Sequence, residues 1–140
     1  MNALSVRAPW WWYILHGGKD IENRDWYTRF RGRVLLHAGK FWKREDIALD
    51  YDCAIGMGGA AIGREEWQRI RAACGCIVGS VEIVGCVKRS DSRWFVGEHG
   101  FVLRNPVTFQ TPIPYRGALG FFEVPDVLVS QVRELREVAQ

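Results

Sequence analysis

The segment 9–24 constrains the fold of this chain more than any other segment of comparable length. Pro9 suits the first turn of a helix and the Gly17-Gly18 pair suits its end, so residues 9–16 are predicted to form a short helix. This helix carries three consecutive tryptophans followed by a tyrosine, Trp10-Trp11-Trp12-Tyr13. Three indoles in a row cannot all face one core, so at least one of them is expected to line a surface or a cleft.

Directly after the glycine pair, the chain carries Lys19, Glu22 and Arg24 within six residues. The segment is predicted to be extended, and the two-residue period of a strand then puts Glu22 and Arg24 on the same side. Charged groups this close to tryptophans indicate a pocket for a flat, polar ligand. A nucleobase with its phosphate fits that description.

Composition and charge distribution are compatible with this interpretation. A chain of 140 residues with 48% hydrophobic and 25% charged residues is expected to form a single globular domain over residues 1–140. The net charge of +3 is too small to indicate nucleic-acid binding by itself. Its distribution is more informative, because residues 24–44 contain seven Lys or Arg and one Asp, whereas residues 45–66 contain six Asp or Glu and one Arg. One end of the domain is therefore expected to be locally basic, as phosphate binding requires.

The four cysteines do not predict a metal site. Cys74 and Cys76 are separated by one residue, which is not the spacing of a common zinc site, and no His-x₃-His pattern accompanies them. The sequence therefore predicts no metal and no other cofactor.

The chain shows no secretory leader and no apolar run of about 18 residues, so a cytoplasmic protein with free thiols and no membrane partner is expected.

Hydrophobic periodicity and turn residues predict an α+β domain in which many short strands surround a few helices. The predicted strands are Gly32–Ala38, Cys76–Lys88, Trp94–Val96, Phe101–Leu103 and Leu119–Val124. The predicted helices after the first are Lys43–Tyr51, Arg64–Ala73 and a C-terminal helix near 126–139. Loops are predicted at Ala54–Gly63, Asn105-Pro106 and Pro112–Pro114.

The chain resembles the ASCH domains, relatives of the PUA RNA-binding fold. The family pattern Gly-x-Lys-x-x-Glu-x-Arg is met by Gly17, Lys19, Glu22 and Arg24. Further similar blocks are Ala3–Trp10, Gly32–Ala38, Gly100–Pro106 and Pro112–Gly117. The resemblance implies a PUA-like β-barrel of about six strands flanked by short helices, with a cleft beside the Lys-Glu-Arg motif.

The roles reported for ASCH domains differ, and so do the functions that the resemblance implies. The first hypothesis is an RNA- or nucleotide-binding domain, with metal-independent hydrolysis of RNA as a candidate activity. Its candidate catalytic residues are Lys19, Tyr13 and Glu22. Tyr13 is included because a tyrosine six residues before the motif lysine is implicated in family ribonucleases. A lysine acts as a general base near neutral pH only if its pKa falls by roughly three units from about 10.4. Burial and Arg24 would lower the pKa of Lys19, whereas Glu22 would raise it.

The candidate ligand-binding residues come from several parts of the chain. Arg24 and Arg116 are candidate phosphate ligands, and Trp10 and Trp94 are candidate stacking platforms. Each has a structural alternative, which is a salt-bridged turn with Lys19 and Glu22 for Arg24, core packing for the tryptophans and an exposed loop position for Arg116. His37 and His16 are expected to be structural, and His99 lies in a predicted glycine-flanked loop. The expected partner is single-stranded RNA, a nucleotide or a nucleoside, with DNA as an alternative.

Two other functions remain open from sequence. One is a recognition module without catalysis. The other is an amidohydrolase of the N4-acetylcytidine type, whose family pattern is Lys-x-x-Thr followed by a distant glutamate. In this chain Glu22 replaces that threonine, and Glu82 is the candidate for the later carboxylate.

Overall fold

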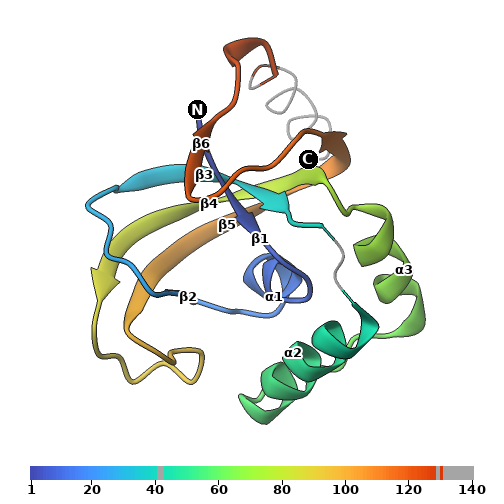
Figure 1. Cartoon of the computed structure of the whole chain (residues 1–140), viewed down its shortest axis with the longest axis vertical. Helices are drawn as coiled ribbons and strands as arrows, with labels where there is room; N and C mark the ends of the chain where they lie inside the picture. The colour runs from blue at the N-terminus through green and yellow to red at the C-terminus, as the bar shows by residue number, and fades with distance from the viewer. Residues whose placement is uncertain (41–42, 129, 131–140) are drawn as a thin grey trace.

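The computed structural model describes residues 1–40, 43–128 and 130, and it arranges six strands in one strongly curved sheet (Figure 1). The strand order is β2-β5-β4-β3-β1-β6. The strands are β1 (Asn2–Val6), β2 (Ile21–Arg24), β3 (Gly32–Ala38), β4 (Cys76–Val87), β5 (His99–Pro114) and β6 (Phe121–Glu123). The helices are α1 (Trp10–His16), α2 (Arg44–Gly56) and α3 (Arg64–Ala72). The predicted α+β class, with about six strands in a barrel-like sheet and a few short helices, is confirmed.

The central part of the sheet is an antiparallel ladder of β3, β4 and β5. On one side of this ladder, β1 runs parallel to β3 and β6 pairs antiparallel to β1. On the other side, the short strand β2 pairs antiparallel to β5. The sheet curls so that β2 and β1 approach each other across an open side (Figure 1).

Helix α1 lies inside the curve of the sheet and forms part of its core (Figure 1). Trp11, Tyr13 and Ile14 are buried on this helix. Tyr13 is fully buried, whereas Leu15 is only partly buried. After the helix, Gly18 adopts a left-handed conformation with φ of 72°, which turns the chain into β2 and which glycine adopts at little cost.

Helix α3 lies to the right of α1 and helix α2 lies below it (Figure 1). Helix α2 extends to Gly56, five residues beyond its predicted end, because Ala54 is completely buried in the core and holds this last turn in place. Glu45 and Asp46 lie in the first turn of α2, where their negative charges interact favourably with the helix dipole. The predicted loop therefore begins after Gly56, and α3 agrees with its prediction to within one residue.

Strand β5 differs most from the sequence prediction, because it continues through both proline-containing segments that were predicted as loops. Ser80 pairs with Val107 and Glu82 with Arg104, so the β5 side has one extra residue between these pairs. This bulge accommodates Asn105, with φ of 53°, and Pro106, which has no N–H to offer the ladder.

The predicted strand Trp94–Val96 is wrong, because these residues form a turn rather than part of the sheet. Trp94 is buried in the core, so its apolar neighbours reflect packing of a turn and not strand alternation. The predicted C-terminal helix near 126–139 falls largely on residues outside the described part of the chain. Among the described residues, no helix has the length and apolar character needed to cross a membrane.

Two glycines of β4 provide a matched test of the packing between β4 and β5. A Cβ atom on Gly79 would lie 2.3 Å from the backbone oxygen of Val107, whereas one on Gly85 would lie 3.4 Å from a methyl carbon of Val102. We expect Gly79→Ala to lower the free energy of unfolding by about 1–3 kcal/mol, because the neighbouring backbone must move. Gly85→Ala should leave urea-induced unfolding nearly unchanged, and equal effects of the two variants would contradict this packing.

Candidate functional site

A cleft with a volume of about 1340 Å³ lies on the open side of the curved sheet. Its walls are formed by the end of β1, by Trp10 of α1, by β2, by α2 and by the loop 115–119. These segments are distant in sequence, and the curvature of the sheet brings them together. Binding pockets for small molecules usually have volumes of roughly 300–1,000 Å³, so this cleft is large enough for a ligand of nucleotide size.

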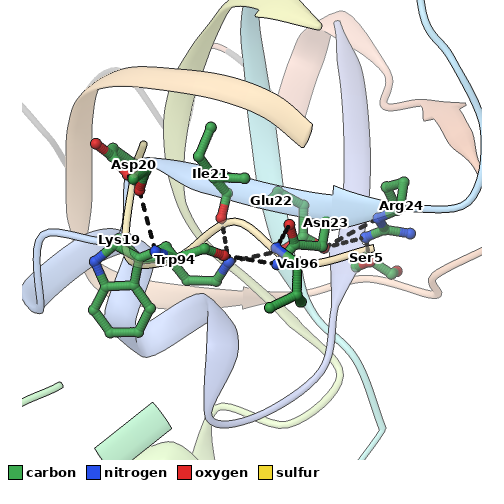
Figure 2. A network of polar contacts seen from close by, with 10 residues as sticks. Ser5, Lys19, Asp20, Ile21, Glu22, Asn23, Arg24, Trp94 and Val96 are labelled. Carbon is green, nitrogen blue, oxygen red and sulfur yellow. Dashed lines mark hydrogen bonds and ion pairs between the residues drawn. The ribbon is translucent and has the colours of Figure 1, made fainter. Parts of the chain in front are cut away.

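A buried carboxylate between two cations forms one wall of the cleft (Figure 2). Glu22 Oε1 lies 3.7 Å from Lys19 Nζ, and Glu22 Oε2 lies 2.9 Å from Arg24 Nη2. Lys19 is 3% exposed and Glu22 is 7% exposed. Buried charges are costly unless they are paired, so Glu22 stabilises the ionised forms of Lys19 and Arg24, and they stabilise its carboxylate. The predicted strand alternation, with Glu22 and Arg24 on one side, is confirmed by their direct contact.

Arg24 also connects the two ends of the curved sheet. Its Nη2 donates a hydrogen bond of 2.8 Å to the backbone oxygen of Ser5 in β1 (Figure 2). Strands β2 and β1 are not neighbours in the sheet order. The guanidinium group therefore bridges the open side of the sheet, where no backbone ladder is formed between these strands.

The Lys19 ammonium group is enclosed by protein groups. It donates a hydrogen bond to the backbone oxygen of Ile21, and its Nζ lies 5.4 Å from the centre of the Trp10 ring and 6.0 Å from that of Trp94. Burial lowers the pKa of Lys19 below its ordinary value, and the negative charge of Glu22 opposes this shift. The two opposing effects named from sequence are therefore both present, and desolvation is the larger of them.

Asn23 attaches the turn 94–96 to strand β2 (Figure 2). Its Nδ2 donates to the backbone oxygen of Trp94, and its Oδ1 accepts a hydrogen bond from the backbone N–H of Val96. These two bonds fix Val96 at the edge of the cleft, where its side chain is half exposed. Asn23 therefore has a positioning role in the cleft wall.

A second polar group in the cleft wall consists of Ser5 and His37. The Ser5 hydroxyl lies 2.8 Å from His37 Nδ1, and His37 Nε2 lies 2.6 Å from the backbone oxygen of Tyr115. A carbonyl oxygen only accepts, so Nε2 carries the proton and Nδ1 of the neutral ring accepts from the Ser5 hydroxyl. His37, for which the sequence predicted a structural role, is buried, and both of its ring nitrogens form hydrogen bonds.

The edges of the cleft carry cations and apolar side chains. Arg116 and Lys40 are exposed lining residues, and neither forms an ion pair with another residue in the described part of the chain. Arg7 differs from them, because its guanidinium forms two hydrogen bonds with the Asp50 carboxylate of α2. Trp26 adds a half-buried indole to the lining, and its ring packs edge-on against Phe101.

The structure brings five of the eight predicted site residues together in the cleft lining, namely Trp10, Lys19, Glu22, Arg24 and Arg116. Tyr13 is not among the lining residues. Its ring is fully buried, its hydroxyl donates a hydrogen bond of 2.7 Å to the backbone oxygen of Ala60, and burial raises its pKa to about 12. The helical spacing that set Tyr13 beside Trp10 does not bring it to the cleft, because Tyr13 points into the core.

Trp94 and Glu82 also lie outside the cleft lining. Trp94 is 2% exposed and packs against Tyr13 in the core, so no base can stack on it without rearrangement. Glu82 lies on β4 and pairs with Arg33 of β3 at 3.2 Å. Core packing, the structural alternative for Trp94, therefore describes its surroundings, and Glu82 forms an ion pair outside the cleft lining.

Sequence reasoning did not single out four residues of the lining, namely Ser5, Asn23, Trp26 and Lys40. The sequence contains a pattern that could have identified two of them. Asn23 lies inside the Lys-Glu-Arg motif, and Lys40 lies inside the basic segment 24–44. Ser5 had no such pattern, because it reaches His37 only through the parallel pairing of β1 with β3. Among the described residues, no group of three or more His, Cys, Asp or Glu side chains is arranged to hold a metal ion.

Comparison with known proteins identifies similar chains. The family model for the ASCH domain matches residues 4–139. Two curated relatives are Activating signal cointegrator 1 from Mus musculus, 24% identical over 125 residues, and Activating signal cointegrator 1 from Homo sapiens, 25% identical over 125 residues. Each match covers 82% of this chain and 21% of the relative, so the chain spans about a fifth of the length of these proteins.

Two glutamates with arginine partners test the role of the buried carboxylate. We expect Glu22→Gln to lower the free energy of unfolding by about 3–5 kcal/mol, because Lys19 then keeps its charge in a buried site without its anion. Glu82→Gln removes a more exposed partner of Arg33 and should cost about 1 kcal/mol or less. Urea denaturation at neutral pH measures both, and a loss for Glu22→Gln no larger than that for Glu82→Gln would contradict the pairing described here.

Proposed function

The chain belongs to the ASCH domain family, and on this basis we propose that its cleft binds a nucleotide or a segment of single-stranded RNA. The observation that carries the proposal is the composition of one cleft, in which indole rings, a buried carboxylate and exposed cations converge. Nucleotides combine a flat aromatic base, hydrogen-bonding edges and a phosphate, and each of these finds a matching group.

The charges of the cleft support phosphate binding at its edge. Lys19 and Arg24 share the carboxylate of Glu22, and Arg7 is paired with Asp50, so each of these cations already has a carboxylate partner in the protein. Arg116 and Lys40 are exposed lining residues without an ion pair in the described part of the chain. A phosphate is therefore expected to contact Arg116 and Lys40 rather than Arg24, which changes the role predicted for Arg24 from ligand to positioning residue.

The interior of the cleft supports recognition of the base. Trp10 and Trp26 present indole rings in the lining, and base–aromatic stacking contributes roughly 1–3 kcal/mol per base. Glu22 offers carboxylate oxygens, which only accept hydrogen bonds and can meet amino or imino groups on a base edge. Single-stranded RNA is the preferred polymer because its bases are unstacked and available, and DNA is the alternative to be compared with it.

Cleavage of RNA is a second candidate function, and one observation favours it. Burial lowers the pKa of Lys19, which favours the neutral amine that a general base requires. The Tyr13 part of this hypothesis lacks support, since the Tyr13 hydroxyl is bound to Ala60 in the core. The amidohydrolase arrangement lacks support in the same way, because Glu82 is paired with Arg33 outside the cleft.

Two exposed arginines test the phosphate contact. We expect Arg116→Ala to weaken binding of single-stranded RNA and to reduce the slope of log K against log salt by about 0.7, the loss of one phosphate contact on a single strand. Arg104→Ala is the matched control, because Arg104 is an exposed arginine of β5 outside the cleft lining. Fluorescence anisotropy over a salt series measures both variants, and identical slopes for the two would remove the assignment of Arg116.

Replacement of Lys19 tests catalysis separately from binding. Lys19→Met removes the amine and keeps most of the side-chain volume. If Lys19 is the base, cleavage of a labelled RNA should fall by about 10²–10⁴-fold while the protein stays folded. Cleavage at the wild-type rate by the folded variant would exclude Lys19 as the base, and absence of cleavage by the wild-type protein would leave binding as the function.

A further inference from the structure

Ser5 and His37 form a hydrogen-bonded pair in the cleft wall that neither nucleotide binding nor the Lys19 hypothesis uses. Both residues belong to the cleft lining, and Ser5 is partly exposed. Their two strands fix the pair, because Ser5 of β1 and His37 of β3 are register partners in the parallel ladder. We propose that this pair is an acyl-transfer centre, in which Ser5 Oγ is the nucleophile and His37 is its general base.

The protonation pattern of the His37 ring is the one that a base for Ser5 requires. Nε2 lies 2.6 Å from the Tyr115 carbonyl oxygen, which can only accept, so Nε2 carries the proton. The lone pair of Nδ1 then points at the Ser5 hydroxyl, 2.8 Å away. A nucleophile, a base within hydrogen-bond reach and a third group that orients the base are the parts of a serine-hydrolase triad. The backbone carbonyl here takes the orienting position that a carboxylate occupies in most triads.

An acyl group can reach the hydroxyl only from the cleft, where Ser5 is a partly exposed lining residue. On the other side Gly117 is packed directly against the pair, and a Cβ atom at this position would come within 2.6 Å of both Ser5 Oγ and His37 Cε1. Any larger residue at 117 would therefore displace Ser5 or His37. Arg24 donates a hydrogen bond to the Ser5 backbone oxygen, so a guanidinium charge also lies next to the nucleophilic residue.

The reaction is hydrolysis of a carboxylic ester in two balanced steps. Ser5 Oγ attacks the ester carbonyl carbon as its proton moves to His37 Nδ1, and collapse of the tetrahedral intermediate breaks the bond to the alcohol oxygen, which takes that proton. Water, losing a proton to Nδ1, then attacks the acyl-serine, and Ser5 Oγ leaves with the proton. Ester and water thus give acid and alcohol, with no other reactant.

Esters fit this centre better than amides. A carbonyl dipole stabilises the imidazolium less than a carboxylate does, and loss of the carboxylate function in a serine protease lowers kcat by about 10⁴-fold. An alkoxy leaving group requires less protonation than an amine does. If the alcohol portion is the ribose of a nucleotide, which rests on the proposed function, the substrate class is an O-acyl nucleotide.

Covalent labelling with a fluorophosphonate tests the nucleophile independently of nucleotide binding. Intact-mass and peptide analysis should locate the adduct at Ser5, and Ser5→Ala should abolish it. His37→Gln keeps a side-chain donor for the Tyr115 oxygen but removes the base, so labelling should slow by about 100-fold or more. Ser90→Ala, which changes an exposed serine of the β4–β5 connection, is the control and should label like wild type.

Hydrolysis of 3′-O-acetyl-AMP, compared with that by Ser5→Ala, tests the substrate class. Release of acetate by wild type alone supports the proposal. Labelling at Ser5 without acetate release overturns the nucleotide-ester substrate and retains the nucleophile. Absence of labelling, or equal labelling rates for folded His37→Gln and wild type, overturns the acyl-transfer centre. Nucleotide affinity, measured on the same Ser5→Ala protein, reports on the proposed function separately.

Discussion

The contact of Glu22 with Lys19 and Arg24 is the interaction on which the rest of the site depends. The carboxylate is buried, and each of its oxygens faces one cation. Without it the buried Lys19 charge would have no anionic partner, and desolvation of an unpaired charge costs several kcal/mol. Arg24 extends the cluster to the Ser5 backbone oxygen and so connects β2 to β1 across the open side of the sheet. One anion thereby holds together the two strands between which the cleft opens.

This arrangement separates structural charge from charge that is available to a ligand. Lys19, Glu22 and Arg24 suggest ligand binding in the sequence, but in the structure they form ion pairs with one another. Arg116 and Lys40 at the cleft edge form no ion pair among the described residues. The motif shapes the cleft wall, and under the proposed function an incoming anion meets Arg116 and Lys40, which lie outside the motif. Fold and motif together therefore indicate the position of a candidate binding site, but they do not determine which reaction takes place there.

The sequence predicted the fold class, the strand Gly32–Ala38 and the alternation of Glu22 and Arg24, because each depends on local periodicity. It failed where tertiary context overrides local signals. Pro106 reads as a loop residue, yet a bulge admits it to β5. Tyr13 lies three residues from Trp10 on α1, yet only Trp10 reaches the cleft, because the Tyr13 ring packs against Trp94 and its hydroxyl is bound to the Ala60 oxygen. The Ser5–His37 contact joins residues 32 positions apart and has no local signal.

Mapping of a ligand on the folded protein tests the central claim most directly. Three glycines of the cleft lining, Gly39, Gly75 and Gly117, and two glycines of β4 outside it, Gly79 and Gly85, give backbone amide signals for comparison. In a ¹⁵N-resolved NMR titration with a mixture of the four ribonucleoside monophosphates, the account predicts shifts at the three cleft glycines and at the Trp10 indole N–H, with Gly79 and Gly85 unchanged. Shifts confined to β4 around Glu82, or no shift in the cleft at millimolar nucleotide, would contradict it.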